Sequence, residues 1–336
     1  MPEGIVSFPQ ILAAREVLAG RVHRTPMLAS AGAAAVLHRA TGVRVADDRV
    51  HLKAEHLQKT GSFKVRGALA RIAAMSDAER ARGVVTVSAG NAAQAYAWAG
   101  AQAGVHVVVV MPAGAVRSKV DACVAYGADV VLHGVHVGET FARMEELRAE
   151  RGLVFCHPFD DPDVIAGNGT AGLEIIEDVP DVDLVVVGIG GGGLIAGVAA
   201  AVRARRSGTR VYGVEPEGSD AMARALAAGK VVRIQPVSVA DGLGAPFAGE
   251  WTLAMVQREV EQVLVVPDPV ILAGLRFALE RTKQVLEPAG AAALGALLFG
   301  HVPIADGERV CVVLSGGNVE LARLGDLVAA AAALPA

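Results

Sequence analysis

Short hydrophobic runs alternate with longer segments of mixed polarity along most of the chain. Valine-rich runs without polar interruption are typical of parallel strands that are covered on both faces. The runs predicted as strands are 51–54, 84–87, 106–111, 129–132, 184–187, 210–214, 263–266 and 310–314. The segments predicted as helices are 92–103, 119–126, 139–151, 194–206, 270–285 and a fraying helix end at 329–336. This alternation predicts a doubly wound α/β architecture.

Composition supports a large core built from small side chains. The 336 residues are 53% hydrophobic but only 4% aromatic, so alanine-rich helices are expected to pack on valine-rich strands. The length suggests about two domains, or one large α/β unit, with 158–162 as the surface crossing between lobes. A net charge of −4 gives no reason to expect nucleic acid or an anionic membrane as partner.

Nothing in the chain predicts a membrane span or a leader. No run approaches the roughly 20 apolar residues that a spanning helix needs. Residues 1–4 lack the basic and apolar regions of a signal peptide. Cys123, Cys156 and Cys311 are odd in number and widely spaced, so they form neither a disulfide framework nor a zinc motif. The expected location is the reducing cytoplasm.

Lys64 is the first candidate for chemistry. It follows a polar turn at 59–62 and is flanked by small or apolar residues. If a helix begins there, the positive helix end and burial both lower the affinity of the amine for a proton. A neutral lysine can attack a carbonyl and form a Schiff base. The alternative is an ordinary exposed lysine, since lysine is seldom buried.

The tetraglycine turn Gly190-Gly191-Gly192-Gly193 is the second candidate. It joins a predicted strand to a predicted helix, where successive glycine N–H groups can converge on a phosphate. Gly188, Gly190 and Gly193 also match G-x-G-x-x-G, and Glu215 ends the next predicted strand, as in dinucleotide sites. An NAD-binding oxidoreductase is therefore an alternative, although it leaves the Lys64 segment unexplained.

Two more polar turns follow predicted strands. Ser88, Gly90 and Asn91 offer N–H, hydroxyl and amide groups that suit a carboxylate or a phenolic oxygen. Ser315 could hydrogen-bond a ring nitrogen. Helix capping by these side chains is the alternative. All of these turns follow the carboxyl ends of strands, which is where open α/β sheets bind ligands.

Taken together, these segments resemble the fold-type II pyridoxal-phosphate (PLP) enzymes, and among them the threonine/serine dehydratase and serine racemase family. The segments that carry the resemblance are 24–27, 62–68, 88–91, 119–122, 164–170, 190–193, 287–290 and 315–318. The resemblance implies a two-lobe α/β architecture in which each lobe is a mostly parallel twisted sheet flanked by helices. Residues 1–79 and 156–336 would form the large PLP-binding lobe, with a small lobe of 80–155 inserted in it.

The resemblance also implies a role for each candidate. Lys64 would hold PLP as a Schiff base and later remove the Cα proton, with Phe63 packed beside the ring. Asn91 would bond the 3′-oxygen of PLP, and Ser315 its pyridine nitrogen. A hydroxyl partner leaves that nitrogen neutral, which suits loss of a β-substituent. The residues expected to cradle the phosphate are Gly190, Gly191, Gly192 and Gly193. Those expected around the substrate are Ser62, Ser88, Ala89, Gly90 and Asn91.

The chain departs from the family pattern at several of these positions. Ala89 stands where racemases carry a serine that acts as acid and base, so dehydration is favoured over racemisation. Ala92 replaces the histidine that is common in dehydratases, and Asn168 the usual glutamine. The segment 240–249 also diverges after its Ala-Asp-Gly. Because such changes affect substrate choice, the β-substituent need not be that of threonine or serine.

A divalent cation, Mg or Ca, is supported by only part of the family pattern. Relatives bind it through a glutamate, a backbone carbonyl and an acidic residue six positions after the glutamate. Glu215 and the Ser219 carbonyl fit this pattern, but the third position is Ala221, and Asp220 lies one place too early. A strand-end charge without metal is the alternative for Glu215.

The activity that the resemblance implies is elimination of water from a β-hydroxy-L-amino acid, L-threonine or L-serine, to give a 2-keto acid and ammonia. The alternatives within the family are a dehydratase for hydroxyaspartate or phenylserine, a serine racemase, and a relative that binds the cofactor without turnover. Only a short segment follows Ser315, so a catabolic enzyme without a regulatory domain is expected. A homodimer is also expected.

Overall fold

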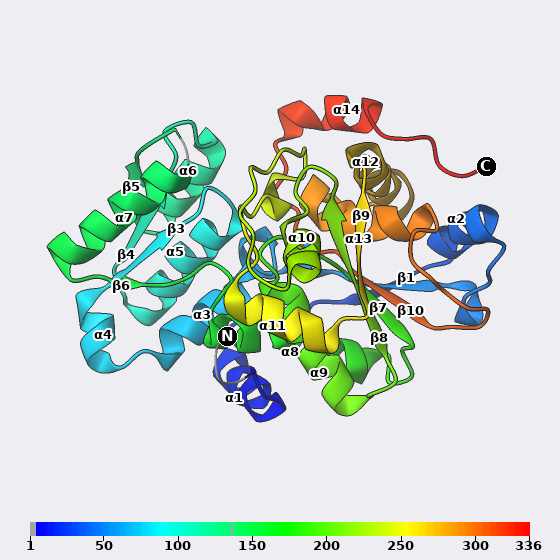
Figure 1. The fold of residues 1–336 in the computed structure, drawn as a ribbon, viewed down its shortest axis with the longest axis horizontal. Helices are drawn as coiled ribbons and strands as arrows, with labels where there is room; N and C mark the ends of the chain where they lie inside the picture. Colours follow the sequence, from blue (N-terminus) through cyan, green and yellow to red (C-terminus); the bar gives the residue numbers. More distant parts are fainter. Residues whose placement is uncertain (1–4, 136) are drawn as a thin grey trace.

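Two twisted sheets, each flanked by helices, form the computed structural model, which describes residues 5–135 and 137–336 (Figure 1). The larger sheet has the order β1-β2-β10-β7-β8-β9, and the smaller has the order β5-β4-β3-β6. All strand pairs are parallel except β1 with β2. This confirms the predicted two-sheet α/β architecture. The strands are β1 Met27–Ser30, β2 Val50–Lys53, β3 Val84–Val87, β4 Val107–Met111, β5 Asp129–Leu132, β6 Val154–Phe155, β7 Leu184–Gly188, β8 Arg210–Pro216, β9 Gln262–Val266 and β10 Val310–Val313.

The helices cover both faces of the sheets. The smaller sheet with α4 to α7 lies at one end of the molecule, and the larger sheet lies at the other (Figure 1). No described helix is long and apolar enough to cross a membrane. The helices are α1 Phe8–Leu18, α2 Ala31–Thr41, α3 Lys64–Ala74, α4 Asp77–Arg82, α5 Asn91–Ala103, α6 Arg117–Ala125, α7 Val137–Arg151, α8 Pro162–Asp178, α9 Gly193–Arg205, α10 Ala221–Ala228, α11 Glu250–Glu259, α12 Asp268–Phe277, α13 Pro288–Leu298 and α14 Leu321–Ala329.

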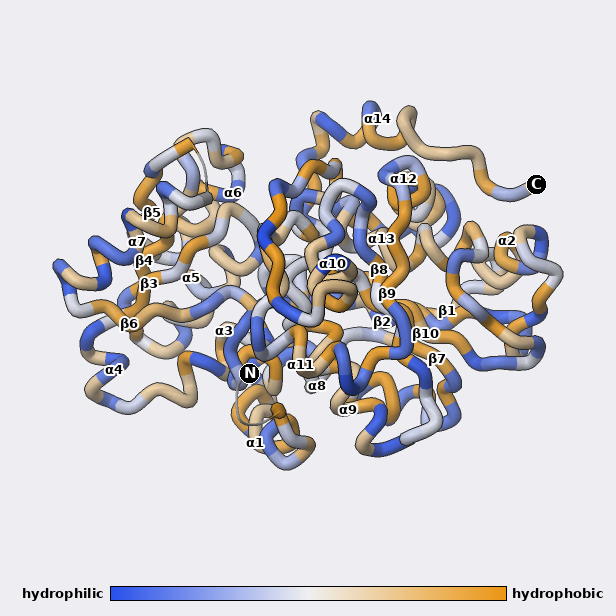
Figure 2. The backbone as a smooth tube through the Cα atoms, viewed as in Figure 1, coloured by the Kyte–Doolittle hydropathy of each residue, from blue (hydrophilic) through white to orange (hydrophobic). Residues whose placement is uncertain are grey.

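The central strands are buried along their whole length. Every residue of β3, β4, β7 and β10 is buried, which explains why these strands read as continuous valine runs. The edge strands β5 and β9 keep exposed positions, and their sequences are more polar at the ends. Figure 2 shows the hydrophobic colouring concentrated along the inner strands and the helices that cover them.

Helix α3 packs into the cores of both lobes. Val65, Leu69 and Ile72 belong to the apolar cluster around the smaller sheet. Ala70, one turn away from Arg66, packs instead with α1 and α8. The helix that begins at Lys64 is therefore held from two sides.

Arg66 fixes the start of α3 by buried charge. Its guanidinium is 1% exposed and pairs with Glu55 at 2.8 Å and with Glu174 at 2.7 Å. The neighbouring Lys53, fully buried, also pairs with Glu174 at 2.7 Å. Buried ion pairs are sensitive to the loss of either partner, since the other charge is then left uncompensated. These pairs hold the strand before α3, the helix itself and α8 in one arrangement.

Two predictions about elements were wrong. The helix expected at 270–285 ends at Phe277, because a π-helical turn, 278–282, follows and Lys283 takes a left-handed φ of 59°. The Thr282 hydroxyl donates to the Ala278 carbonyl at 2.9 Å, which stabilises this turn.

The C-terminal tail is also different from the prediction. Helix α14 ends at Ala329, and the residues after it form a turn and an extended tail rather than a fraying helix. The N–H of Ala332 donates to the Pro269 carbonyl, and the Pro335 carbonyl accepts from Arg39. The segment 158–162 connects β6 of the smaller sheet to α8, and Phe159 is the residue of this segment that is buried. Residues 1–4, on which the argument against a leader rested, lie outside the described residues.

Candidate active site

A cavity of about 280 Å³ lies between the two lobes, at the carboxyl ends of the strands. This is the position expected for a ligand site in an open α/β sheet. The cavity brings together most of the candidates chosen from sequence. Those that line it are Phe63, Lys64, Ser88, Ala89, Gly90, Asn91, Gly190, Gly191, Gly192, Gly193 and Ser315.

Lys64 is the first residue of α3, and a tight reversal places it there. Thr60 and Gly61 both have positive φ values, 57° and 75°. A Cβ at Gly61 would also collide with the Asn318 side chain, so glycine is required on two grounds. Ser62 then pairs with Gly316 in an isolated antiparallel bridge, and the helix begins. The lysine is thus delivered to the cavity by a turn that the larger sheet anchors.

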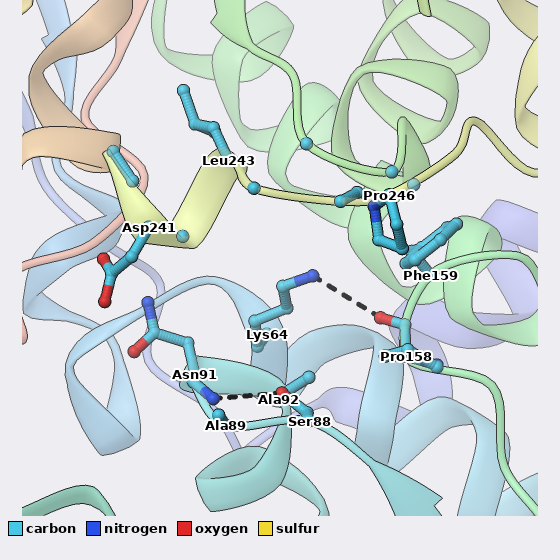
Figure 3. A pocket seen from close by; sticks show the side chains of 18 of the residues that line it. Lys64, Ser88, Ala89, Asn91, Ala92, Pro158, Phe159, Asp241, Leu243 and Pro246 are labelled. Atoms are coloured by element: carbon cyan, nitrogen blue, oxygen red, sulfur yellow. Dashed lines mark hydrogen bonds between the residues drawn. The ribbon is translucent and has the colours of Figure 1, made fainter. Parts of the chain in front are cut away.

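The Lys64 amine is adapted to act as a neutral base or nucleophile. Burial lowers its pKa to about 8, and the nearby Glu287 carboxylate opposes part of this shift. The Nζ atom lies 3.4 Å from the Pro158 carbonyl and 5.0 Å from the centre of the Phe63 ring. In Figure 3, Lys64 points from α3 into the middle of the cavity, toward Pro158.

The tetraglycine turn has no room for side chains. A Cβ at Gly191 would collide with the Phe159 ring, and one at Gly193 would lie 2.7 Å from the Phe159 carbonyl. Gly192 has a φ of 93° and caps α9. Among the described residues, the N–H groups of the four glycines donate to no backbone acceptor, whereas the Gly191 carbonyl accepts from Thr252 at 2.7 Å. The turn therefore offers free donors at a positive helix end, which is a site for a phosphate.

Asn91 begins α5 and is held at both ends of its amide. Its Nδ2 donates to Glu287 at 2.5 Å, and its Oδ1 accepts from Asn318 at 2.8 Å. Glu287 is buried and is the N-cap residue of α13. Burial raises its pKa to about 7. These bonds join the smaller-sheet helix α5 to two segments of the larger lobe, so Asn91 is a fixed donor in the cavity wall.

The two serines follow the ends of strands as predicted. The buried Ser315 follows β10, and its hydroxyl lies 3.5 Å from the Ala289 carbonyl. Ser88 follows β3, and its hydroxyl accepts the N–H of Gly90 at 3.1 Å. This bond shapes the turn that contains Ala89, whose methyl group faces the same cavity.

Ser62 and Glu215 are placed differently from the other candidates. Ser62 is fully buried with no hydrogen-bond partner for its hydroxyl, and it is not among the residues that line the cavity. Glu215 is also fully buried, and its carboxylate oxygens accept the N–H groups of Met222 and Ala223 at 2.9 and 2.8 Å. Its pKa is raised to about 7 by burial. Within residues 5–135 and 137–336, no cluster of three or more metal-ligating His, Cys, Asp or Glu side chains occurs.

Sequence reasoning gave no role to Lys119, Asp241, Glu287 or Phe159, all of which line the cavity. Lys119 on α6 and Asp241 in the larger lobe form an ion pair of 2.6 Å. The segments around Lys119 and Glu287 contributed to the family resemblance, and this was the available signal for both. No sequence motif indicated a role for Phe159. Its packing on the glycine turn depends on the path that the chain takes from the smaller sheet back to the larger lobe.

The cavity fits PLP on its own geometry. It combines a lysine of lowered pKa, a turn that excludes even a methyl group while exposing N–H donors, and a serine at a strand end. These features define a site for a phosphorylated carbonyl compound.

Comparisons with known proteins agree with this geometry. The family model described as "Pyridoxal-phosphate dependent enzyme" matches residues 19–316, so the chain belongs to this family and PLP is its cofactor. The catabolic L-threonine dehydratase TdcB of Escherichia coli K12 is 39% identical over 96% of each chain. The structure of a threonine deaminase from T.th. is 40% identical, with a TM-score of 0.84 over 94% of this chain and 99% of that one. Maize serine racemase is 34% identical, with a TM-score of 0.89 over 96% of this chain and 97% of that one.

Proposed function

We propose that the protein is a PLP-dependent ammonia-lyase that converts a β-hydroxy-L-amino acid, in the first place L-threonine or L-serine, to a 2-keto acid and ammonia. One observation carries the proposal: the Lys64 amine and the tetraglycine turn line a single cavity, in a chain about 39% identical to a threonine dehydratase over nearly its full length.

Several residues of the cavity would have a role in this reaction. When bound, PLP supplies the electron sink that stabilises negative charge at the substrate Cα. Lys64 would hold the cofactor aldehyde through its side-chain nitrogen, and its free amine would accept the substrate Cα proton at Nζ. An amine with a pKa of about 8 is roughly one-tenth neutral at pH 7, far more than an ordinary lysine, and the neutral form is the one that a general base requires.

The other side chains orient the reactants. Gly190–Gly193 would donate N–H groups to the cofactor phosphate, and Phe63 would pack beside the ring. Asn91 would donate to the ring 3′-oxygen, and Ser315 would contact the pyridine nitrogen. The turn with Ser88, Ala89 and Gly90 would receive the substrate carboxylate, whereas Ser62 does not line the cavity and has no direct contact with the substrate in this proposal.

Keto-acid release from a panel of β-hydroxy amino acids tests the proposal. The purified holoprotein is expected to be yellow, to be bleached by borohydride, and to form keto acid from threonine or serine. Lys64→Ala is expected to lose both the colour and the activity, by several orders of magnitude in kcat. A folded, yellow wild-type protein that releases no keto acid from any member of the panel would overturn the proposal.

The alternative activities have less support. Racemisation needs a proton donor on the opposite ring face, and Ala89 offers only a methyl group there. Family membership overturns the NAD-binding alternative, and Glu215 has both carboxylate oxygens engaged by backbone N–H groups rather than free for a ribose.

We further propose that residues 1–79 with 156–336 form the large lobe and 80–155 the small lobe. All strands of the smaller sheet lie within 84–155, which supports this division.

We also propose that the protein is a cytoplasmic homodimer. The three buried, free cysteines support the cytoplasmic location, and exposed apolar side chains at Leu57 and Leu321 support the dimer. Light scattering measures the oligomeric state.

We also propose a divalent cation near Glu215. A comparison of the thermal unfolding temperature with and without Mg²⁺ tests this site.

A further inference from the structure

A series of aromatic rings runs beside the cavity, and some of its members line it. Phe159 lies 4.5 Å from His157 and 5.8 Å from Phe247, measured between ring centres. His157 contacts Phe155 at 5.7 Å, and Phe155 contacts Phe141 at 6.3 Å. The rings therefore run from α7 of the smaller lobe, through the crossing segment, to a loop of the larger lobe.

Three of these rings face the cavity: Phe141, Phe159 and Phe247. In a chain that is only 4% aromatic, three phenylalanines from distant segments meet at one site. Pro246 lines the cavity near Phe159, and Leu243 lines it nearer to Asp241 (Figure 3). Figure 3 shows Phe159, Pro158 and Pro246 on the side toward which the Lys64 amine points, with Asp241 and Asn91 on the other side.

His157 adds no positive charge to this wall. Burial, together with the nearby Lys64, lowers its pKa to about 4, so the imidazole is neutral at physiological pH. Its Nδ1 accepts the N–H groups of Phe159 and Asp160 at 3.3 and 2.8 Å. Arg233 lies with its guanidinium 4.9 Å from the centre of the Phe247 ring, but it is not among the residues that line the cavity.

The opposite side of the cavity is already balanced in charge. Among the described lining residues the basic side chains are Lys64, which the cofactor engages, and Lys119, which is paired with Asp241. Glu287 adds a second carboxyl group there, buried and bonded to Asn91. A substrate with a carboxylate at Cβ would meet two acidic side chains and no unpaired cation, and an unpaired charge in a partly buried site is strongly disfavoured.

We propose that the aromatic wall of Phe141, Phe159 and Phe247 binds the β-substituent, and that the cavity selects 3-hydroxy amino acids with an uncharged, apolar and especially aromatic β-substituent. An aryl ring gains apolar burial and edge-to-face contacts at such a wall, whereas a carboxylate gains neither. This preference deepens the proposed lyase function and rests on it.

The test compares kcat/KM of the holoenzyme for L-threonine, L-threo-phenylserine and L-threo-3-hydroxyaspartate. Phenylserine is expected to exceed hydroxyaspartate by at least about tenfold. A titration that follows the absorbance of the bound cofactor gives the affinity for each amino acid independently of turnover, and it is expected to show the same order.

Variants locate the preference in the wall. Two separate variants, Phe247→Leu and Phe141→Leu, are each expected to lower the phenylserine-to-threonine ratio of kcat/KM by roughly three- to tenfold. Phe155→Leu is the matched control, because Phe155 belongs to the ring series but does not line the cavity, and it is expected to leave the ratio unchanged. Thermal unfolding verifies that each variant is folded.

The outcomes separate the two proposals. Keto acid from threonine together with equal or higher efficiency for hydroxyaspartate overturns the apolar preference and leaves the lyase function standing. A ratio that is unchanged in both wall variants, or changed equally in Phe155→Leu, also overturns the role of the wall. No keto acid from any of the three substrates overturns the lyase function, and with it the preference that rests on it.

Discussion

The Lys119 ammonium lies 2.6 Å from the Asp241 carboxylate, and this ion pair joins the two lobes at the cavity. Lys119 belongs to α6 beside the smaller sheet, whereas Asp241 begins a short helical turn in the larger lobe. The lysine side chain is 10% exposed and its partner 50%, so the pair lies where the cavity meets solvent. We therefore expect this contact to couple the separation of the lobes to access to Lys64.

Removing this contact is expected to weaken substrate binding more than chemistry. For Lys119→Met we expect KM to rise up to about fivefold with little change in kcat, because a half-exposed ion pair contributes about 1 kcal/mol or less. The KM of the wild type is also expected to rise with salt, and that of the variant to be less sensitive. Steady-state kinetics at low and high salt measures both. Arg117→Met, which breaks an exposed pair on the same helix, is the control. Equal kinetics in both variants would contradict the coupling.

Cofactor capture by the apoprotein is expected to depend on pH through Lys64. Only the neutral amine attacks the aldehyde, and burial lowers the pKa of this amine to about 8. The rate of capture should therefore rise as the pH increases through about 8 and level off above it, well before the ordinary lysine value of 10.5. Stopped-flow absorbance of PLP binding measures the profile. A rate that keeps rising to about pH 10, the ordinary range of a lysine, would show that Lys64 is not desolvated.

Glu287 is expected to make the free energy of unfolding decrease as the pH rises, whereas most carboxylates make it increase. Burial raises its pKa from 4.5 to about 7, so the folded state holds this proton more tightly than the unfolded chain. The stability it contributes is full below about pH 4.5 and is lost as the pH rises through 7. Glu287→Gln keeps an acceptor for Asn91 without the charge. Its Tm relative to wild type should therefore increase from about pH 5 to about pH 8, and calorimetry that shows a constant difference would contradict this.

The glycine turn is expected to reject a single methyl group because of Phe159. Gly191→Ala places a Cβ into the Phe159 ring and should cost about 1–3 kcal/mol, with a weaker affinity for PLP. The double variant with Phe159→Leu should recover part of this loss. Gly325→Ala in α14, where an added Cβ meets nothing within 4 Å, is the control. Denaturant unfolding and PLP titration measure the effects, and no recovery in the double variant would point to a cause other than the ring.

The sequence was sufficient for the features that depend on local pattern. Buried parallel strands such as β7 can be recognised as valine runs. The turns around Lys64 and Gly190–Gly193 can be recognised because few other structures require such residues at such positions. The end of α12 at Phe277 could not be predicted in this way. Its apolar periodicity continues past that point, while the helix ends because of a π-helical turn and the left-handed Lys283.

The missed site residues depend on the meeting of distant segments. Glu287 and Asn91 are separated by 196 positions, and Lys119 and Asp241 by 122. No local pattern encodes such a pair, since each partner alone looks like an ordinary surface charge or helix cap. The aromatic wall is of the same kind, because its three phenylalanines come from three separate segments. These contacts form only when the two lobes pack together. The sequence of either lobe alone therefore does not predict them.

Helix α3 carries a consequence for folding cooperativity. Because side chains of α3 pack in the cores of both lobes, melting of either lobe would remove part of the packing that holds the lysine at the start of the helix. Two lobes of this size would otherwise be free to unfold in separate steps. Because both lobes share this helix, we expect the molecule to unfold in one calorimetric transition, without a partly melted species that keeps a competent nucleophile.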